Sequence, residues 1–147
     1  MKRIVTSLAL VSLLALIACV PKEYRYSGAT LNQNNTKTAG VGDVFFRQET
    51  MYGEDNGFGV IYKGEAKAFD LTVVSLTDSS ISLQYNEYMK LPVTQYGGFR
   101  PGDPWVIRDK FSQKYDYILT NKRIKFRDYE FEVLGVGNGS IQYRRIR

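Results

Sequence analysis

Apolar and polar residues alternate with a period of two in several short segments of this 147-residue chain. Residues 69–73 are Phe-Asp-Leu-Thr-Val, and the same alternation recurs at 81–86 and 129–133. No segment has a sustained helical period, and turns rich in Gly and Asn, such as 137–139, separate the alternating segments. The pattern predicts an all-β fold, either a small antiparallel β-barrel or a sandwich of seven or eight short strands.

Histidine is absent and cysteine occurs once, at Cys19. A Ser-His-Asp triad, a Cys-His pair, a zinc site of His and Cys and an intrachain disulfide are therefore all excluded. Glu130 and Glu132 alternate along one predicted strand, which is typical of a solvated face rather than of a catalytic pair. The acidic segment 53–57 lacks the spacing of a calcium loop and favours a hairpin turn. We expect no enzyme activity, no cofactor and no metal.

The first 18 residues have the features of a secretory signal peptide. Lys2 and Arg3 form a short basic start, and the stretch 4–18 is almost wholly apolar. This stretch is shorter than the roughly 20 residues that a membrane-spanning helix needs. The pattern therefore predicts removal of residues 1–18 on export rather than a permanent membrane span.

The end of this stretch, Leu16-Ile17-Ala18-Cys19, resembles the lipobox of bacterial lipoprotein precursors. The resemblance implies that Cys19 receives a diacylglycerol, that the signal is cut before it, and that the new amine is acylated with a fatty acid such as palmitate. In this class an Asp after the Cys tends to keep the protein at the inner membrane; here the residue is Val20, which favours the outer membrane. The alternative is an ordinary signal peptide with an incidental cysteine.

Two further predictions concern the organisation of the exported chain. Residues 19–40 are polar and have no apolar period, so they predict a flexible, lipidated tether before a β domain at 41–147. Comparison of the chain with itself at a shift of 60 residues aligns 69–81 with 129–141. This similarity has two explanations: a duplicated half of the domain, or a general likeness between two hairpins of one barrel.

The segment from Pro92 to Trp105 interrupts the alternating pattern and contains three of the four prolines. Long loops on a compact scaffold are more often functional than idle. Tyr96, Phe99, Arg100 and Trp105 belong to types enriched in binding hot spots, so they are the candidate partner-binding residues. Alternatively, Phe99 and Trp105 fold back and plug one end of the barrel.

Without Lys2 and Arg3 the chain has 18 basic and 15 acidic residues, and the excess lies near the C-terminus. We do not expect nucleic-acid binding, because an exported, anchored protein rarely meets nucleic acid. The function hypothesis is a non-catalytic binding or accessory module of the bacterial envelope. It would be held in the outer membrane by lipid on Cys19 and would contact an envelope protein. The alternative is an inhibitor of a cell-wall-degrading enzyme such as lysozyme, by analogy of fold and location only.

Overall fold

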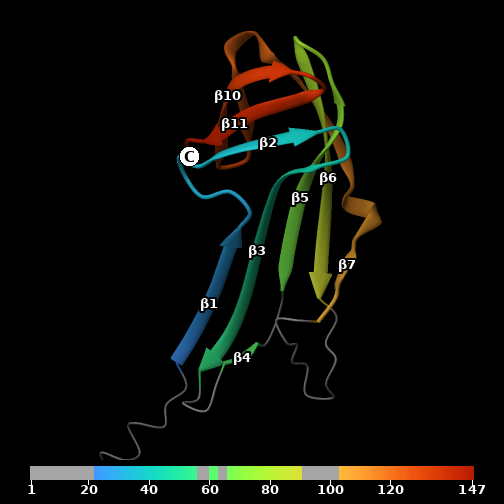
Figure 1. Ribbon diagram of the computed structural model, residues 1–147. Helices are drawn as coiled ribbons and strands as arrows, with labels where there is room; N and C mark the ends of the chain where they lie inside the picture. Colours follow the sequence, from blue (N-terminus) through green and yellow to red (C-terminus); the bar gives the residue numbers. More distant parts are fainter. Residues whose placement is uncertain (1–21, 56–59, 63–65, 91–102) are drawn as a thin grey trace, which may run out of the picture.

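The chain is described by a computed structural model that covers residues 22–55, 60–62, 66–90 and 103–147 (Figure 1). These residues form eleven β-strands and two short 3₁₀ helices, Asp109–Phe111 and Leu119–Asn121. Within them, no helix has the length and apolar character needed to cross a membrane. The strands build two antiparallel sheets that pack as a sandwich, which confirms the all-β prediction and selects the sandwich over the closed barrel.

The larger sheet has seven strands and the smaller sheet has four. In the larger sheet the order is β1-β3-β5-β6-β7, with β4 beside β3 and β8 beside β6. Its strands are β1 (Lys22–Ala29), β3 (Val44–Asp55), β4 (Val60–Tyr62), β5 (Lys67–Leu76), β6 (Ser80–Lys90), β7 (Trp105–Ile107) and β8 (Gln113–Ile118). The smaller sheet consists, in spatial order, of β2 (Thr36–Gly40), β11 (Ser140–Arg145), β10 (Tyr129–Gly137) and β9 (Arg123–Phe126).

The main core lies between the two sheets and is dominated by aromatic rings. Phe45 stacks on Tyr143 with 3.9 Å between ring centroids, and Phe131 meets Phe45 edge-on at 5.0 Å. The Tyr143 hydroxyl donates a hydrogen bond to the backbone carbonyl of Phe45, and burial raises the pKa of Tyr143. Full burial of one such side chain contributes about 1.5–3 kcal/mol, so these rings are a major source of stability.

The smaller sheet covers only part of the larger one, and the rest of the larger sheet extends beyond it (Figure 1). We call this part the extension; it comprises residues 22–28, 49–55, 60–62, 66–68, 86–90 and 105–107. It has a small core of its own, in which Met51, Tyr62 and Ala66 are buried and Trp105 packs against them. The extension therefore has far less apolar burial than the sandwich part.

The prediction of a flexible tether over residues 19–40 is wrong for most of that segment, because it contains β1 and β2. β1 pairs with β3 over eight residues in register, and β2 pairs with β11. Leu31 and Ala39 are buried in the main core. The polar pattern gave no strand signal because β1 and β2 are edge strands, held by backbone hydrogen bonds more than by apolar side chains. These two strands account for part of the excess over the seven or eight predicted.

The hairpins β5–β6 and β10–β11 correspond to each other at a shift of 60 residues. The pairing register repeats at this shift, including a β-bulge that follows Val73 in β5 and Val133 in β10. Residues 71–81 and 131–141 also have the same sequence of buried, half-buried and exposed positions. Each hairpin is flanked similarly, in the orders β3-β5-β6-β8 and β9-β10-β11-β2, so the likeness covers all four strands of the smaller sheet and four of the larger one.

Candidate functional site

Of the four partner-binding residues predicted from the sequence, Tyr96, Phe99 and Arg100 lie outside the described residues. Trp105 is the first residue of β7 and pairs with Lys90 of β6. Its ring packs against the small core of the extension rather than against the main core. Trp105 thus lies on the face of the larger sheet that the smaller sheet does not cover, which we call the far face.

Trp105 belongs to a polar cluster on this far face, centred on Asp70. The side chain of Asp70 accepts hydrogen bonds from Tyr88 Oη at 2.7 Å and Asn86 Nδ2 at 3.0 Å. The guanidinium of Arg47 lies 3.7 Å from the carboxylate of Asp70. The same guanidinium lies over the rings of Tyr88, at 4.9 Å, and Trp105, at 5.7 Å. With Lys90 of β6 also over its ring, at 4.9 Å, Trp105 is contacted by cations from two other strands.

Asp70 is only 3% exposed, although the alternating pattern places it on the polar face of β5. Burial, and next the hydrogen bond to Asp70, raise the pKa of Tyr88 to about 12. Within the described part of the chain, every buried side-chain nitrogen or oxygen has a hydrogen-bond partner. A fully paired network of this kind is suited to fixing the sheet rather than to binding a ligand.

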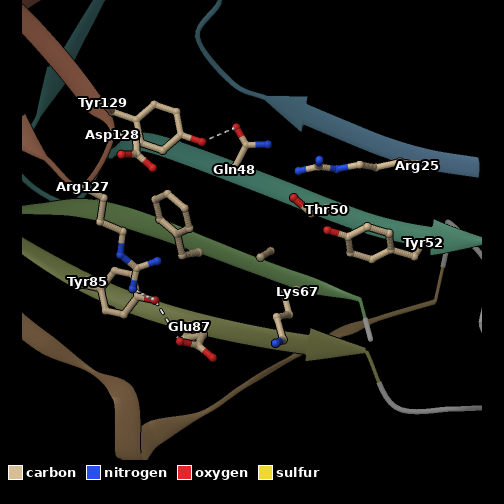
Figure 2. A pocket seen from close by; sticks show the side chains of 12 residues that line it. Arg25, Gln48, Thr50, Tyr52, Lys67, Tyr85, Glu87, Arg127, Asp128 and Tyr129 are labelled. Atoms are coloured by element: carbon tan, nitrogen blue, oxygen red, sulfur yellow. Dashed lines mark hydrogen bonds between the residues drawn. The ribbon is translucent and has the colours of Figure 1, made fainter. Parts of the chain in front are cut away.

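A cleft of about 440 Å³ opens on the opposite face, at the step where the smaller sheet ends (Figure 2). The period of two places Gln48, Thr50 and Tyr52 of β3 on the same side of the sheet. Four other segments complete the walls. They contribute Arg25 of β1, Lys67, Ala68 and Phe69 of β5, Tyr85 and Glu87 of β6, and Arg127, Asp128 and Tyr129 of the β9–β10 turn.

Arg127 is directed into the cleft by a tight turn. Its backbone has a φ of 52°, in the left-handed region, where β9 turns into β10. The guanidinium lies over the rings of Tyr85, at 4.7 Å, and Phe69, at 5.1 Å, and its Nη2 donates to Tyr85 Oη at 2.8 Å. No described carboxylate lies within ion-pair distance of Arg127, so its direct contacts in the cleft are the ring faces and the Tyr85 hydroxyl.

Arg25 faces the cleft from the other side, on β1 (Figure 2). Its guanidinium lies 5.6 Å from the ring centroid of Tyr52, and again no described carboxylate forms an ion pair with it. Gln48 and Thr50 lie between the two arginines. Gln48 accepts a hydrogen bond from Tyr129 Oη at 3.1 Å and donates one to Ser27 Oγ at 2.9 Å. The floor between the arginines is therefore polar and held in place.

The acidic side chain of Glu87 is already engaged. It accepts a hydrogen bond from Arg108 Nη1 at 2.5 Å and another from Tyr85 Oη at 3.0 Å. Burial, and next the bond to Glu87, raise the pKa of Tyr85. The described residues contain no group of three acidic or cysteine side chains that could hold a metal ion. The cleft thus has one guanidinium group on each side, and a guanidinium group binds a carboxylate or a phosphate through paired N–H donors.

The sequence analysis did not predict the cleft, and the reason differs for its two arginines. Arg25 lies in the segment predicted to be a flexible tether. Arg127 ends the alternating run 123–127, which resembles an ordinary solvated basic strand. A basic residue directly before Asp128 and Tyr129 is only a weak turn signal. It does not indicate that the guanidinium of Arg127 lies over the rings of Phe69 and Tyr85.

Comparison of the chain with protein-family models, with curated proteins and with solved structures found no match in any of the three. Function is therefore inferred from the chain's own residues.

Proposed function

We propose that this chain is a lipid-anchored protein of the bacterial outer membrane whose β-sandwich is a non-catalytic binding module. The basic start, the apolar stretch and the Leu16–Cys19 segment support export and acylation of Cys19, and Val20 supports the outer membrane. In this proposal the partner is an envelope protein that presents acidic side chains to the cleft. The mild positive charge of the exported chain is compatible with such a partner.

The observation that carries the proposal is the state of the two cleft arginines. Four other arginines, at positions 47, 108, 123 and 144, each lie 2.5–2.8 Å from a carboxylate oxygen. Arg25 and Arg127 instead rest on aromatic rings at either side of a cleft, with no carboxylate partner among the described residues. Stacking restricts a guanidinium, so little entropy is lost when an anion binds to its N–H edge, of which Arg127 uses only Nη2, in its bond to Tyr85.

The cleft also contains two carboxylates, Glu87 and Asp128. We favour binding as its function over catalysis by these carboxylates. The carboxylate of Glu87 already accepts hydrogen bonds from Arg108 and Tyr85, one on each oxygen, so it is poorly placed to act as a base. The alternative hypothesis, inhibition of a cell-wall-degrading enzyme, stays a prediction, and no observation of the cleft favours it over other acidic partners.

The cleft is tested by photo-crosslinking in living cells that produce the full chain. A photoreactive phenylalanine derivative replaces Tyr52, which is 47% exposed at the cleft, and a second version carries it at Gln142, exposed on β11. We expect a dominant protein product at position 52 that is absent at 142. The same products at both positions would contradict binding in the cleft.

The role of Arg127 is tested in the same cells. Because a hydrogen bond to a charged group contributes about 1.5–3 kcal/mol, R127Q should reduce the product at position 52 by about tenfold or more. The matched control is R123Q, which removes an arginine of the adjacent strand that pairs with Glu130 outside the cleft. Equal reduction by both substitutions would show that general charge, and not the cleft, holds the partner.

The anchor is tested separately. We expect Cys19→Ser to abolish incorporation of radiolabelled palmitate and to release the protein from the membrane fraction. Palmitate incorporation that persists in this variant would contradict acylation at Cys19.

A further inference from the structure

The distance between the anchor and the folded domain is short. β1 begins at Lys22, only three residues after Cys19. A fully extended chain spans at most about 3.6 Å per residue, so the Cα atoms of Cys19 and Lys22 are separated by at most roughly 11 Å. With acyl chains on Cys19, as proposed above, the start of β1 must lie close to the lipid headgroups. The domain has no length of chain with which to stand off from the membrane.

The pairing of the strands shows which part of the domain this brings to the lipid. Lys22 is paired with Asp55 at the end of β3, and Asp55 is paired with Val60 at the start of β4. These three positions mark the end of the extension that lies farthest from the smaller sheet (Figure 1), which we call the open end. The β5–β6 turn lies at the opposite end of the larger sheet. β5 runs from Lys67, within the extension, to Leu76 at this turn, and its nine steps of about 3.3 Å span about 30 Å.

From these observations we infer that the open end of the larger sheet faces the lipid surface and that the sandwich part points away from it. The inference rests on the proposed acylation of Cys19. The occupant of the open end is the headgroup layer, because the three-residue connection to the anchor leaves no room for a partner protein between them. Ile61 of β4, 48% exposed and paired with Glu54, lies next to this surface.

This orientation also sets the height of the cleft. Arg25 is three residues along β1 from Lys22, so the near wall of the cleft lies about 10 Å from the open end. Tyr52, beside Arg25 in the register, lies at the same height. An aromatic ring with a cation beside it is a common combination near headgroups. The cleft therefore receives partners that are themselves held at, or close to, the membrane surface.

The orientation is tested with the full, acylated chain in vesicles of phosphatidylethanolamine and phosphatidylglycerol that contain a lipid with a spin-labelled headgroup. Since the one natural cysteine is acylated, an introduced cysteine is the only thiol that reacts with a fluorophore. The label is placed at Ile61→Cys near the open end, and at Asp78→Cys in the β5–β6 turn as the matched distal position. Glu23→Cys, exposed on β1, gives a second proximal position that does not depend on the folding of the Ile61 variant.

We expect the spin label to quench both proximal fluorophores at least threefold more strongly than the distal one. Equal quenching at the two ends, or stronger quenching at Asp78→Cys, in protein that floats with the vesicles would overturn the orientation while leaving the anchor intact. Protein that does not float with the vesicles would overturn the anchor and the orientation together. The two failures are thus distinguished by flotation.

Discussion

The hairpins β5–β6 and β10–β11 share a framework but end differently. β10 starts at Tyr129, directly after the tight turn at Arg127, and β11 ends at Arg145. The positions that correspond to these ends in the first hairpin are 69 and 85. There β5 begins earlier, at Lys67, and β6 ends later, at Lys90, so the first hairpin is longer. The cleft lies at this step, where the β9–β10 turn that precedes the shorter hairpin meets the strands of the longer one. Added length in one of two similar hairpins has thus produced a site without altering the shared core.

The largest expected effects come from corresponding core positions of the two hairpins. Phe131→Ala and Leu71→Ala, which correspond at the shift of 60, should each destabilise the domain by about 3–5 kcal/mol. Denaturant unfolding would be followed by circular dichroism and by the fluorescence of Trp105, the one tryptophan, which reports on the extension.

We expect both probes to shift together in both variants, because the small core of the extension cannot sustain folding without the sandwich. A Trp105 transition that stays in place while the circular dichroism transition moves would show instead that the extension folds independently.

The next largest effect concerns the far face of the larger sheet, which has no counterpart in the smaller one. Tyr88→Phe removes a hydrogen bond to the buried carboxylate of Asp70, which should cost about 1.5–3 kcal/mol at neutral pH. The pKa of Tyr88 is raised from its ordinary value of 10 to about 12 in the folded protein. The unfolded chain therefore loses this proton first as the pH rises, and the stabilisation, complete below pH 10, is lost progressively between 10 and about 12.

The measurement is the difference in unfolding free energy between the parent and Tyr88→Phe across this pH window. The difference should shrink as the pH rises. A difference that is constant from below pH 10 to 12 would mean that Tyr88 does not retain its proton in the folded state.

A smaller effect distinguishes the turns of the two hairpins. Gly139 has a φ of 71°, so Gly139→Ala should cost about 1 kcal/mol. At the corresponding turn no residue has a positive φ, and Thr77 Oγ1 accepts the backbone N–H of Ser80 at 3.0 Å instead. Ser79→Ala should therefore change the midpoint of thermal unfolding very little. Equal losses at both positions would show that the two turns are not built differently.

The smallest effect concerns the surface of the second hairpin. Arg144 Nε lies 2.6 Å from Glu132 Oε2, whereas the corresponding residues of the first hairpin are Gln84 and Thr72. Exposed ion pairs contribute about 0–1 kcal/mol, so Arg144→Gln should cost less than about 0.5 kcal/mol. The loss should vanish in concentrated salt, and a loss that persists there would indicate a packing role for the Arg144 stem.

Sequence alternation predicted the strands that bury one face, such as 69–73 and 129–133, because burial on one side imposes a period of two. It failed for β1, whose side chains are largely exposed and whose position depends on hydrogen bonds to β3. It set Asp70 apart from the apolar face of its strand but did not indicate its burial, since the covering side chains of Arg47 and Tyr88 come from other strands.

The cleft was beyond sequence reasoning for a related reason. Arg25 and Arg127 are brought to one site by the β1–β3 register and by the step between the sheets, and neither leaves a local pattern. Residue type alone did single out Trp105, but not the partners that fix its ring.

The pairing of β1 with β3 has a mechanical consequence for an anchored protein. A force that pulls on Cys19 along the axis of β1 acts in shear on all eight residue pairs, from Lys22–Asp55 to Ala29–Gln48, at the same time. A force at right angles to the strand opens the same pairs one after another, beginning at Lys22. With Cys19 anchored as proposed, the resistance of the domain to extraction would depend on the direction of the pull, because the β1–β3 pairing is strongest against tension along β1.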